Sequence, residues 1–510
     1  MTSSITSLGL MGLNCYRVTV ESDVQPGTAS FDLVGLPGAA VRESRDRVRA
    51  AIHNSGLSFP TGRIIINLAP ADVNKDTPLY DLPVMLALLS ACNQLPPPPE
   101  DAAFVGELSL SGEVRAVKGI LPMALHARDM GVRKLYVPAA NAAEASLVRG
   151  LEVCGVTTCQ QLMEDLNSHR AIAPTTVDLD MLLSQPPSGD LPDFADVRGQ
   201  GFARRAMEVA AAGGHNILML GPPGTGKSML AKRLPSILPP LTEQEAIEVT
   251  QIYSVAGLLS QQGLMTARPF RSPHHTSSTV ALAGGGRLPR PGELSLAHCG
   301  VLFLDELPEF GSSSLEVLRQ PMEDGAITLS RVAGSVSYPS RCMVVGALNP
   351  CPCGHFGQEG QTCTCSQADI SRYLRKISGP LLDRMDLQVE VGGLSYDEMS
   401  AEPGESSAAI RDRVVEARMR QRQRFEGTGV RSNAHMTRRQ LAEFCGMTED
   451  AEEFLRSAFN RLGLSGRSFD RLRKVARTIA DLERHDVIRR EHLAEAVRYR
   501  ALDQKYWRRK

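Results

Sequence analysis

The sequence lacks any long hydrophobic run. No uninterrupted apolar stretch approaches the roughly twenty residues that a helix needs to cross a bilayer. The start, Met1–Ser7, also lacks the basic segment followed by an apolar segment that marks a secretory leader. Neither sign of charge dominates, since the formal net charge at pH 7 is −1, so overall charge selects no partner. We therefore expect a cytoplasmic protein that does not work at a membrane.

The number and spacing of the cysteines do not indicate a disulfide framework. The eleven cysteines are odd in number and mostly scattered, unlike the paired cysteines of small secreted proteins. The apolar fraction of 42% and the charged fraction of 22% are ordinary for a globular protein. The length of 510 residues leaves room for about three domains, each with its own core. Residues 401–510 carry more lysine and arginine than acid, so the C-terminal part is the basic end.

The most informative stretch is a short apolar run that breaks into a glycine-rich loop and then resumes as a helix, Asn216–Lys232. Its spacing, Gly-x4-Gly-Lys-Ser, lets backbone amides wrap a triphosphate at the start of a helix. We expect Lys227 to reach the β and γ phosphates and the Ser228 hydroxyl to hold Mg²⁺. The predicted ATP contacts are Gly221, Pro222, Pro223, Gly224, Thr225, Gly226, Lys227 and Ser228.

A second acidic motif supports this site. The apolar run Val301–Leu304 is typical of a buried parallel strand, and it ends in Asp305 and Glu306. Asp305 suits Mg²⁺, and Glu306 suits orienting the attacking water. The alternative is a core strand with a solvated acidic end. Together the motifs predict an α/β protein with a P-loop core built on a parallel sheet.

The N-terminal region has a mixed α/β pattern. We expect strands at Ile64–Leu68 and Lys134–Val137, and helices at Leu82–Leu89 and Pro122–Met130, each with a proline near its start. Residues 173–193 have the composition of a linker, without a helical or alternating period.

Part of this region resembles the proteolytic domain of the Lon family, a ribosomal S5 domain 2-like fold that recurs in the recombination protein RadA. The resemblance is carried by Lys75–Pro83 and Phe104–Val114. The Lon enzyme uses a serine activated by a lysine, but those positions fall here on Leu79 and Leu121. The resemblance therefore implies a protease fold without protease chemistry, used for assembly or nucleic-acid binding. An ordinary α/β domain is the alternative.

The residues between the two phosphate motifs resemble the magnesium-chelatase motor subunit and its AAA+ relatives, in which an insertion faces a central pore. The matching stretches are Arg268–Thr276 and Gly284–Glu293. Arg271, Arg287 and Arg290 could contact phosphate backbones there, or the loop could be a solvated basic face. The adjacent His274 and His275 would point opposite ways on a strand, so we expect structural or phosphate contacts from them and no shared metal.

The residues after Glu306 predict a hairpin, Gly325–Pro339, with Arg331 near its tip, and then a buried strand, Val344–Leu348. By the same resemblance, Asn349 holds the hydrolytic water. Four thiols follow, which we interpret as a structural Zn²⁺ site with His355 as a substitute ligand, although the Cys-x-Cys spacing is tight. A redox pair or unliganded cysteines are the alternatives. The candidate zinc ligands are Cys351, Cys353, Cys363 and Cys365.

The stretch Gly379–Leu387 resembles the segment that carries the arginine finger of these motors, which implies that Arg384 reaches a neighbouring subunit's site. A salt bridge to Asp383 or Asp386 is the alternative. Arg467 best matches the second sensor, an arginine at a helix start that touches the γ phosphate, with Arg471 as competitor.

The C-terminal residues predict helices. In one of them Ile410, Val414 and Ala417 form an apolar stripe, while six arginines between Arg411 and Arg424 form either a solvated face or a nucleic-acid contact. The basic aromatic end, Lys505–Lys510, could stack on bases or fray.

Taken together, the order of parts is similar to the ComM (YifB) family. The resemblance implies an inactive Lon-like domain (1–172), a linker (173–193), a magnesium-chelatase-type AAA+ core (194–394, with a cysteine loop at 351–365) and a C-terminal helical lid (405–510). It further implies a hexameric ring that hydrolyses ATP with Mg²⁺ to drive branch migration of DNA junctions during natural transformation. The rival hypotheses are a motor that remodels a protein, an ATP-dependent protease and a nucleotide-gated scaffold.

Overall fold

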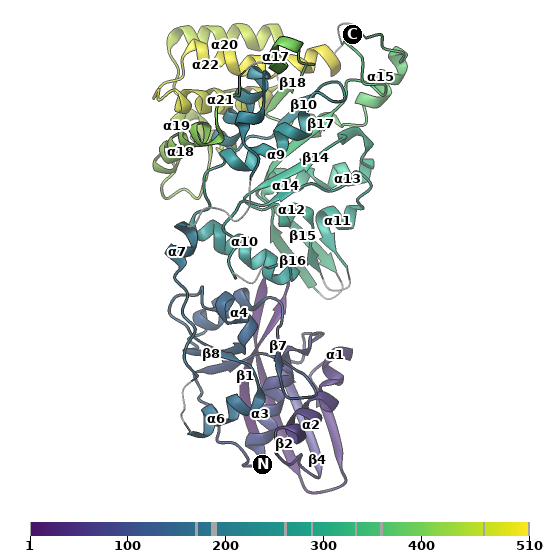
Figure 1. The fold of residues 1–510 in the computed structure, drawn as a ribbon, viewed down its shortest axis with the longest axis vertical. Helices are drawn as coiled ribbons and strands as arrows, with labels where there is room; N and C mark the ends of the chain where they lie inside the picture. The colour runs from purple at the N-terminus through teal and green to yellow at the C-terminus, as the bar shows by residue number, and fades with distance from the viewer. Residues whose placement is uncertain are drawn as a thin grey trace.

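The protein is described here by a computed structural model. It describes residues 2–507 except 169–171, 185–190, 260–262, 287–288, 332–333, 358–360, 401 and 463–464. The chain is elongated, with the N-terminal part at one end and a larger α/β and helical part at the other (Figure 1).

The N-terminal part contains a mixed four-stranded sheet in the order β1–β2–β4–β3, in which only β3 and β4 run parallel. Alternate residues of β4 are buried, which is the pattern of a strand with one face on a core. Its elements are β1 (Thr2–Met11), β2 (Asn14–Gln25), β3 (Ser30–Val34), α1 (Ala39–Arg42), α2 (Ser44–Asn54), β4 (Arg63–Ala69) and α3 (Asp81–Ala91).

A second, three-stranded parallel sheet, β5–β8–β9, completes this part. Helix α3 is buried on nearly every side, because it contacts β1, β2 and α2 at once. The predicted strands and helices of this region are all present, within a few residues of their expected ends. The remaining elements are β5 (Ala102–Phe104), β6 (Glu107–Leu108), β7 (Val114–Arg115), α4 (Ile120–Asp129), β8 (Lys134–Pro138), α5 (Ala142–Ala145), β9 (Glu152–Val156) and α6 (Cys159–Ser168).

The linker prediction was wrong in one respect. Residues 179–184 form a short helix, α7 (Leu179–Ser184), where the sequence showed no helical period. Leu179 is buried, and Leu182 and Leu183 pack on the N-terminal core. A six-residue helix is too short to display a period in the sequence, so tertiary packing decides its structure.

The middle part is built on a five-stranded parallel sheet in the order β11–β14–β17–β10–β18. Strands β10, β14 and β17 are buried along their whole length, as expected for a sheet covered on both faces. The strands are β10 (Ile217–Leu220), β11 (Phe270–Arg271), β14 (Val301–Leu304), β17 (Met343–Leu348) and β18 (Leu387–Glu390).

Helices and two small hairpins surround this sheet. The predicted hairpin is present as β15 (Ala326–Arg331) and β16 (Gly334–Pro339), and a shorter one pairs β12 (Gly284–Gly285) with β13 (Arg290–Pro291). The helices are α8 (Gly201–Gly213), α9 (Lys227–Ile237), α10 (Glu243–Ala256), α11 (Thr279–Ala283), α12 (Glu293–Leu296), α13 (Ser312–Val317), α14 (Arg319–Asp324), α15 (Gln367–Leu374), α16 (Gly379–Leu382) and α17 (Tyr396–Ser400).

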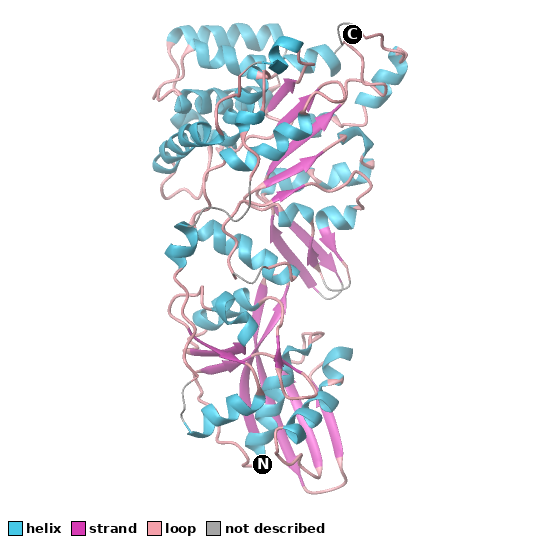
Figure 2. Cartoon of the chain, viewed as in Figure 1, coloured by secondary structure: helices cyan, strands magenta, loops and turns pink. Residues whose placement is uncertain are grey.

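The C-terminal part is helical throughout (Figure 2). It shares one hydrophobic core with the sheet, since Val389 of β18 lies in the same buried cluster as Val414 and Ile479. Ile410, Val414 and Ala417 are buried, which confirms the predicted stripe. The elements are α18 (Ser407–Arg424), α19 (Arg438–Phe444), α20 (Glu449–Leu462), α21 (Gly466–Leu482), α22 (Arg490–Arg498) and a π-helical turn, η6 (Asp503–Trp507).

Helix α10 joins the two ends of the molecule. It follows the phosphate loop in sequence, yet Val249, Ile252 and Tyr253 are buried in the same cluster as the N-terminal sheet. Two polar contacts reinforce this packing: the Ser254 hydroxyl of α10 donates to the buried Glu144 carboxylate, which also accepts from the Leu121 amide at 2.9 Å. The N-terminal part and the part built on the five-stranded sheet therefore form one packed body.

Candidate functional site

The phosphate loop lies where the sequence places it. Strand β10 ends at Leu220 and helix α9 begins at Lys227, so the intervening loop opens directly onto a helix N-terminus. Gly224 and Gly226 have φ of 78° and 89°, values that favour glycine. The loop residues expected to contact ATP are Gly221, Pro222, Pro223, Gly224, Thr225 and Gly226, followed by Lys227 and Ser228 on α9.

The Lys227 ammonium lies inside this loop. Its Nζ donates to the carbonyl oxygens of Gly221 at 2.7 Å and Pro222 at 2.8 Å, and to Asn349 Oδ1 at 3.2 Å. Burial lowers the pKa of Lys227 to about 8, although the charge of Asp305 acts in the opposite direction. The contact brings the predicted sensor Asn349, from the end of β17, next to the phosphate loop.

The predicted magnesium ligands are in contact. Ser228 Oγ donates to Asp305 Oδ2 at 2.6 Å, across the ends of α9 and β14. Asp305 Oδ1 accepts from the Glu306 amide at 2.9 Å, which fixes the carboxylate relative to the backbone. A hydroxyl beside a carboxylate at the phosphate loop is the donor set that Mg²⁺ takes in P-loop enzymes.

Glu306 contacts His275, a residue that no sequence motif connected with it. Its Oε2 lies 3.2 Å from His275 Nδ1, and its backbone has φ of 50°. His274 and His275 do not lie on a strand, the condition under which they would point apart: they lie in a turn after β11, and their rings are tilted by 34° with centroids 4.1 Å apart. His275 also meets the Phe310 ring edge-on. The histidine thus reaches the carboxylate expected to orient water.

The pKa of Lys227 predicts how nucleotide binding depends on pH. A bound polyphosphate raises the pKa of this ammonium, so binding takes up a proton once the pH exceeds about 8. ATP affinity is therefore expected to be constant and highest below pH 8, and to fall by up to about tenfold per pH unit above it. Calorimetric titration at pH 7 and pH 9 measures this.

Two variants sharpen the pH experiment. Lys227→Arg cannot titrate in this range and should give a flat profile, whereas Lys232→Ala, on the exposed face of α9, should keep the wild-type slope. Equal wild-type affinities at pH 7 and pH 9 would contradict the assignment.

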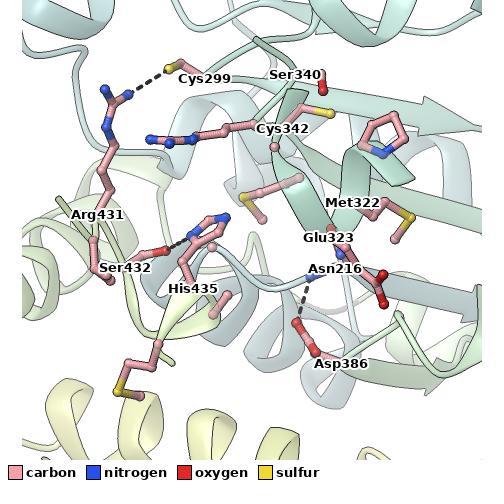
Figure 3. Close-up of a pocket in the computed structure, with 18 of the residues that line it drawn as sticks. Asn216, Cys299, Met322, Glu323, Ser340, Cys342, Asp386, Arg431, Ser432 and His435 are labelled. Atoms are coloured by element: carbon pink, nitrogen blue, oxygen red, sulfur yellow. Dashed lines mark hydrogen bonds between the residues drawn. The ribbon is translucent and has the colours of Figure 1, made fainter. Parts of the chain in front are cut away.

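A second cluster lies at the opposite edge of the same sheet. A cavity of about 490 Å³ opens between the starts of β10, β17 and β18 and the C-terminal helices. Asn216, Glu323 and Asp386 lie on one side, and Arg431, Ser432 and His435 on the other (Figure 3). Basic residues outnumber acidic ones in its lining; they are Arg268, Arg341, Arg384, Arg418, Arg431, Arg471 and Lys474.

Burial and neighbouring charges shift the pKa values of two groups that line this cavity. Burial opposes ionisation of Asp386, but the hydrogen bond with His215 and the charge of Arg471 outweigh it and lower its pKa to about 2. Burial, reinforced by Arg418 and Lys474, lowers the pKa of His435 to about 4. The cavity is consequently cationic near neutral pH and suits an anion.

Arg384 and Arg471 line this cavity together. Arg384 is buried, pairs with Glu323 and donates to the Pro380 carbonyl at 2.7 Å, so neither Asp383 nor Asp386 is its ion-pair partner. Arg471 Nε lies 3.4 Å from Asp386 Oδ1. Arg467 is exposed at the first turn of α21 and does not line the cavity. Of the two sensor candidates, Arg471 is the one beside Arg384.

The four cysteines of the 351–365 loop converge, and all four are free thiols. The Sγ atoms of Cys351, Cys353 and Cys363 are 3.3, 3.7 and 3.6 Å apart, and that of Cys365 lies within 4.8 Å of the others. Within the described part of the chain, His355 does not belong to this group, so it is not a substitute ligand here. Residues 358–360 of the loop lie outside the described residues.

Most of the basic residues proposed to contact nucleic acid have protein partners. Arg271 forms two hydrogen bonds with Glu293 at 2.7 and 2.8 Å. In α18, Arg413, Arg418, Arg420 and Arg424 contact carboxylates or carbonyls of neighbouring elements, so this helix face is mainly a packing surface. Arg290 is exposed. Arg287, the Arg331 side chain and residues 508–510 lie outside what the structure describes.

The two positions that correspond to the Lon dyad are apolar and enclosed. Leu79 lies in a buried turn before α3, and Leu121 is fully buried in α4. Leucine offers no nucleophile or base, so these positions cannot perform a serine–lysine reaction.

Comparison with known proteins relates the chain to a subunit of magnesium chelatase. Residues 193–399 match the family described as magnesium chelatase, subunit ChlI; residues 20–141 match subunit ChlI of Mg-chelatase; residues 404–500 match its C-terminal family. No helix in the described ranges is long and apolar enough to span a membrane.

Two relatives match nearly end to end. A protein named YifB from Escherichia coli is 43% identical over 508 residues, covering 98% of this chain and 97% of the relative. Competence protein ComM from Haemophilus influenzae is 41% identical over 507 residues, with the same two shares. A shorter match, 37% over 92 residues, links 18% of this chain to 22% of the DNA repair protein RadA of Streptococcus pneumoniae.

Proposed function

Because the chain belongs to the ComM and YifB family of magnesium-chelatase-like AAA+ proteins, we propose that it is an ATP-hydrolysing DNA motor. In this proposal a hexameric ring drives branch migration and unwinding of DNA junctions when incoming DNA recombines during natural transformation. The observation that carries the ATPase part is the 2.6 Å contact between Ser228 and Asp305 beside the buried ammonium of Lys227.

Each residue near the phosphate loop has a proposed role. The loop amides and Lys227 bind the triphosphate, and Ser228 with Asp305 would hold Mg²⁺, which would supply positive charge that stabilises the transferring phosphoryl group. Glu306 takes the proton of the water that attacks the γ phosphorus, while the amide of Asn349 orients that water. The bond from the γ phosphorus to the bridging oxygen breaks, and ADP leaves with that oxygen.

The proposal that a neighbouring subunit completes the site is supported by the positions of the key residues at the two ends of the parallel strands. Strands β10 and β18 run parallel, so the phosphate loop lies at their carboxyl ends while Asn216 and Asp386 precede their amino ends. Arg384 and Arg471 consequently lie a strand's length from their own phosphate loop. In a head-to-tail ring, one subunit's loop edge faces the next subunit's cationic cavity. We therefore propose Arg384 as the trans arginine and favour Arg471 over Arg467 as the second sensor.

The DNA part of the proposal is supported by relatives rather than by contacts in the chain. One relative is named for competence and another for DNA repair. Work on DNA would place the protein in the cytoplasm. The N-terminal part is proposed to be an inactive Lon-like platform, and the helices after Ser407 a lid over the nucleotide.

The deciding experiment measures ATP turnover and strand displacement together. Forked and three-stranded DNA should raise the ATPase rate of the wild type and be unwound, whereas Glu306→Gln should bind the same DNA without unwinding it. If neither DNA binds or raises turnover, the motor acts on something else.

A protein-remodelling motor is the second candidate, because all three family matches are to magnesium chelatase. It predicts ATP turnover that is stimulated by a protein partner and indifferent to DNA, so the same assay separates the two functions.

A further inference from the structure

The cysteine loop has the arrangement of a tetrahedral metal site. Zinc–sulfur bonds of about 2.3 Å in tetrahedral geometry place sulfur atoms about 3.8 Å apart, whereas a disulfide needs about 2.05 Å. The separations among the Sγ atoms of Cys351, Cys353 and Cys363, 3.3, 3.7 and 3.6 Å, therefore suit a shared cation and exclude a disulfide between them. Four thiolates in this geometry select zinc over oxygen-preferring cations.

One side of this loop rests on the phosphate loop. Gly354 has φ of 86°, and a Cβ placed there would lie 2.5 Å from Pro223 Cδ. The close approach needs a glycine, because any larger residue would push Pro223 away. Cys351 also follows Asn349 by two residues, and Asn349 contacts Lys227. The cysteine loop thus adjoins the proposed phosphate site in two places, at Pro223 and, through Asn349, at Lys227.

The other side of the loop holds the C-terminal segment. Phe356 meets the Tyr506 ring edge-on with centroids 6.2 Å apart, and Cys351 lies in the same buried cluster as Tyr506. Tyr506 in turn donates to Glu390 at 3.0 Å, and Trp507 Nε1 donates to the Leu374 carbonyl at 3.4 Å. The cysteine loop therefore lies between the phosphate loop and the chain's last helical turn.

We propose that Cys351, Cys353, Cys363 and Cys365 bind one zinc ion, and that the zinc-bound loop clamps the C-terminal segment and the phosphate loop together so that ATP turnover depends on zinc. The claim that zinc binds here does not depend on the proposed function. The claim that zinc controls ATP turnover rests on the proposed ATPase function. Metal binding joins the two cysteine pairs, which lie near each other in the sequence, and so fixes the loop between them.

The first test is metal content. Full-length protein purified in reducing buffer with zinc should carry about one zinc per chain, measured by mass spectrometry of the metal. Cys363→Ser and Cys365→Ser, at half-buried positions, should lose it, whereas Cys92→Ser, a half-buried cysteine of the N-terminal part, should keep it. Wild-type protein without bound zinc, with iron in its place, or with a disulfide in the cluster would overturn the assignment.

The second test uses Trp507, the single tryptophan of the sequence. Removing zinc from the wild type should shift its fluorescence to longer wavelength as the segment detaches, and adding zinc back should reverse the shift. Cys92→Ser should respond like the wild type, and Cys363→Ser should show the shifted emission from the start. Unchanged emission upon loss of zinc would overturn the clamp.

The third test separates this inference from the proposed function. Zinc removal should lower kcat/KM for ATP by about tenfold to a hundredfold, because small displacements of the phosphate loop are costly. Lys227→Ala should retain zinc and its fluorescence response while losing turnover. A protein that binds zinc and shows the fluorescence response but never hydrolyses ATP would overturn the ATPase and the coupling while leaving the metal site in place.

Discussion

Replacing Arg384 by alanine is expected to lower ATP turnover by about 10³ to 10⁵-fold, because an arginine that neutralises the transferring phosphoryl group has effects of that size. ATP binding should survive, since Arg384 lies at the sheet edge opposite its own phosphate loop. Arg375→Ala is the matched control, because Arg375 is an exposed arginine in the preceding turn. Steady-state phosphate release measures the loss.

Mixing variants tests whether Arg384 acts across a subunit boundary. Arg384→Ala subunits keep Glu306, and Glu306→Gln subunits keep Arg384, so neither is active alone. In a randomly assembled equal mixture, about a quarter of the interfaces combine both intact groups, and activity should partly return. Recovery would also show that Arg384→Ala is folded. A mixture that stays as inactive as its components, with both ATP-binding competent, would mean that Arg384 serves its own subunit or none.

The second large effect is expected at Glu306. Glu306→Gln keeps the shape and the hydrogen-bonding oxygen but removes the base, so turnover should fall by about 10² to 10⁴-fold while ATP affinity changes little. Glu309→Gln, on the exposed side of the following turn, is the control. Pre-steady-state phosphate release distinguishes slow chemistry from slow product loss. Near-normal hydrolysis by Glu306→Gln would shift the role to another group, and His275, whose Nδ1 lies 3.2 Å from Glu306 Oε2, would be the first to test.

Contiguous motifs made the local structure around the candidate phosphate site predictable from the sequence. The spacing from Gly221 to Ser228 determines a loop followed by a helix, and the apolar run before Asp305 determines a buried strand end. Both predictions depend only on residues that are close together in the sequence, so they can be made without knowing the tertiary fold. The hairpin at 325–339 was predictable for the same reason.

Contacts between distant segments were not predictable in this way. His275 meets Glu306 because β11 pairs with β14, and a two-residue strand leaves almost no sequence signal. The cationic cavity forms because β18 lies beside β10, which brings Asp386 to Asn216, and because α21 then packs Arg471 against them. No spacing rule connects residues so far apart in the chain. Helix α7 was not predicted because it is only six residues long and is stabilised by packing on the N-terminal core.

Helix α10 has a consequence for any attempt to dissect the chain. A fragment beginning at residue 194 would keep the glycine-rich loop but would lose the N-terminal members of the hydrophobic cluster that holds Val249, Ile252 and Tyr253, which exposes part of this apolar stripe to water. Such an exposed apolar stripe favours aggregation. The part of the chain after residue 194 is therefore not a detachable module.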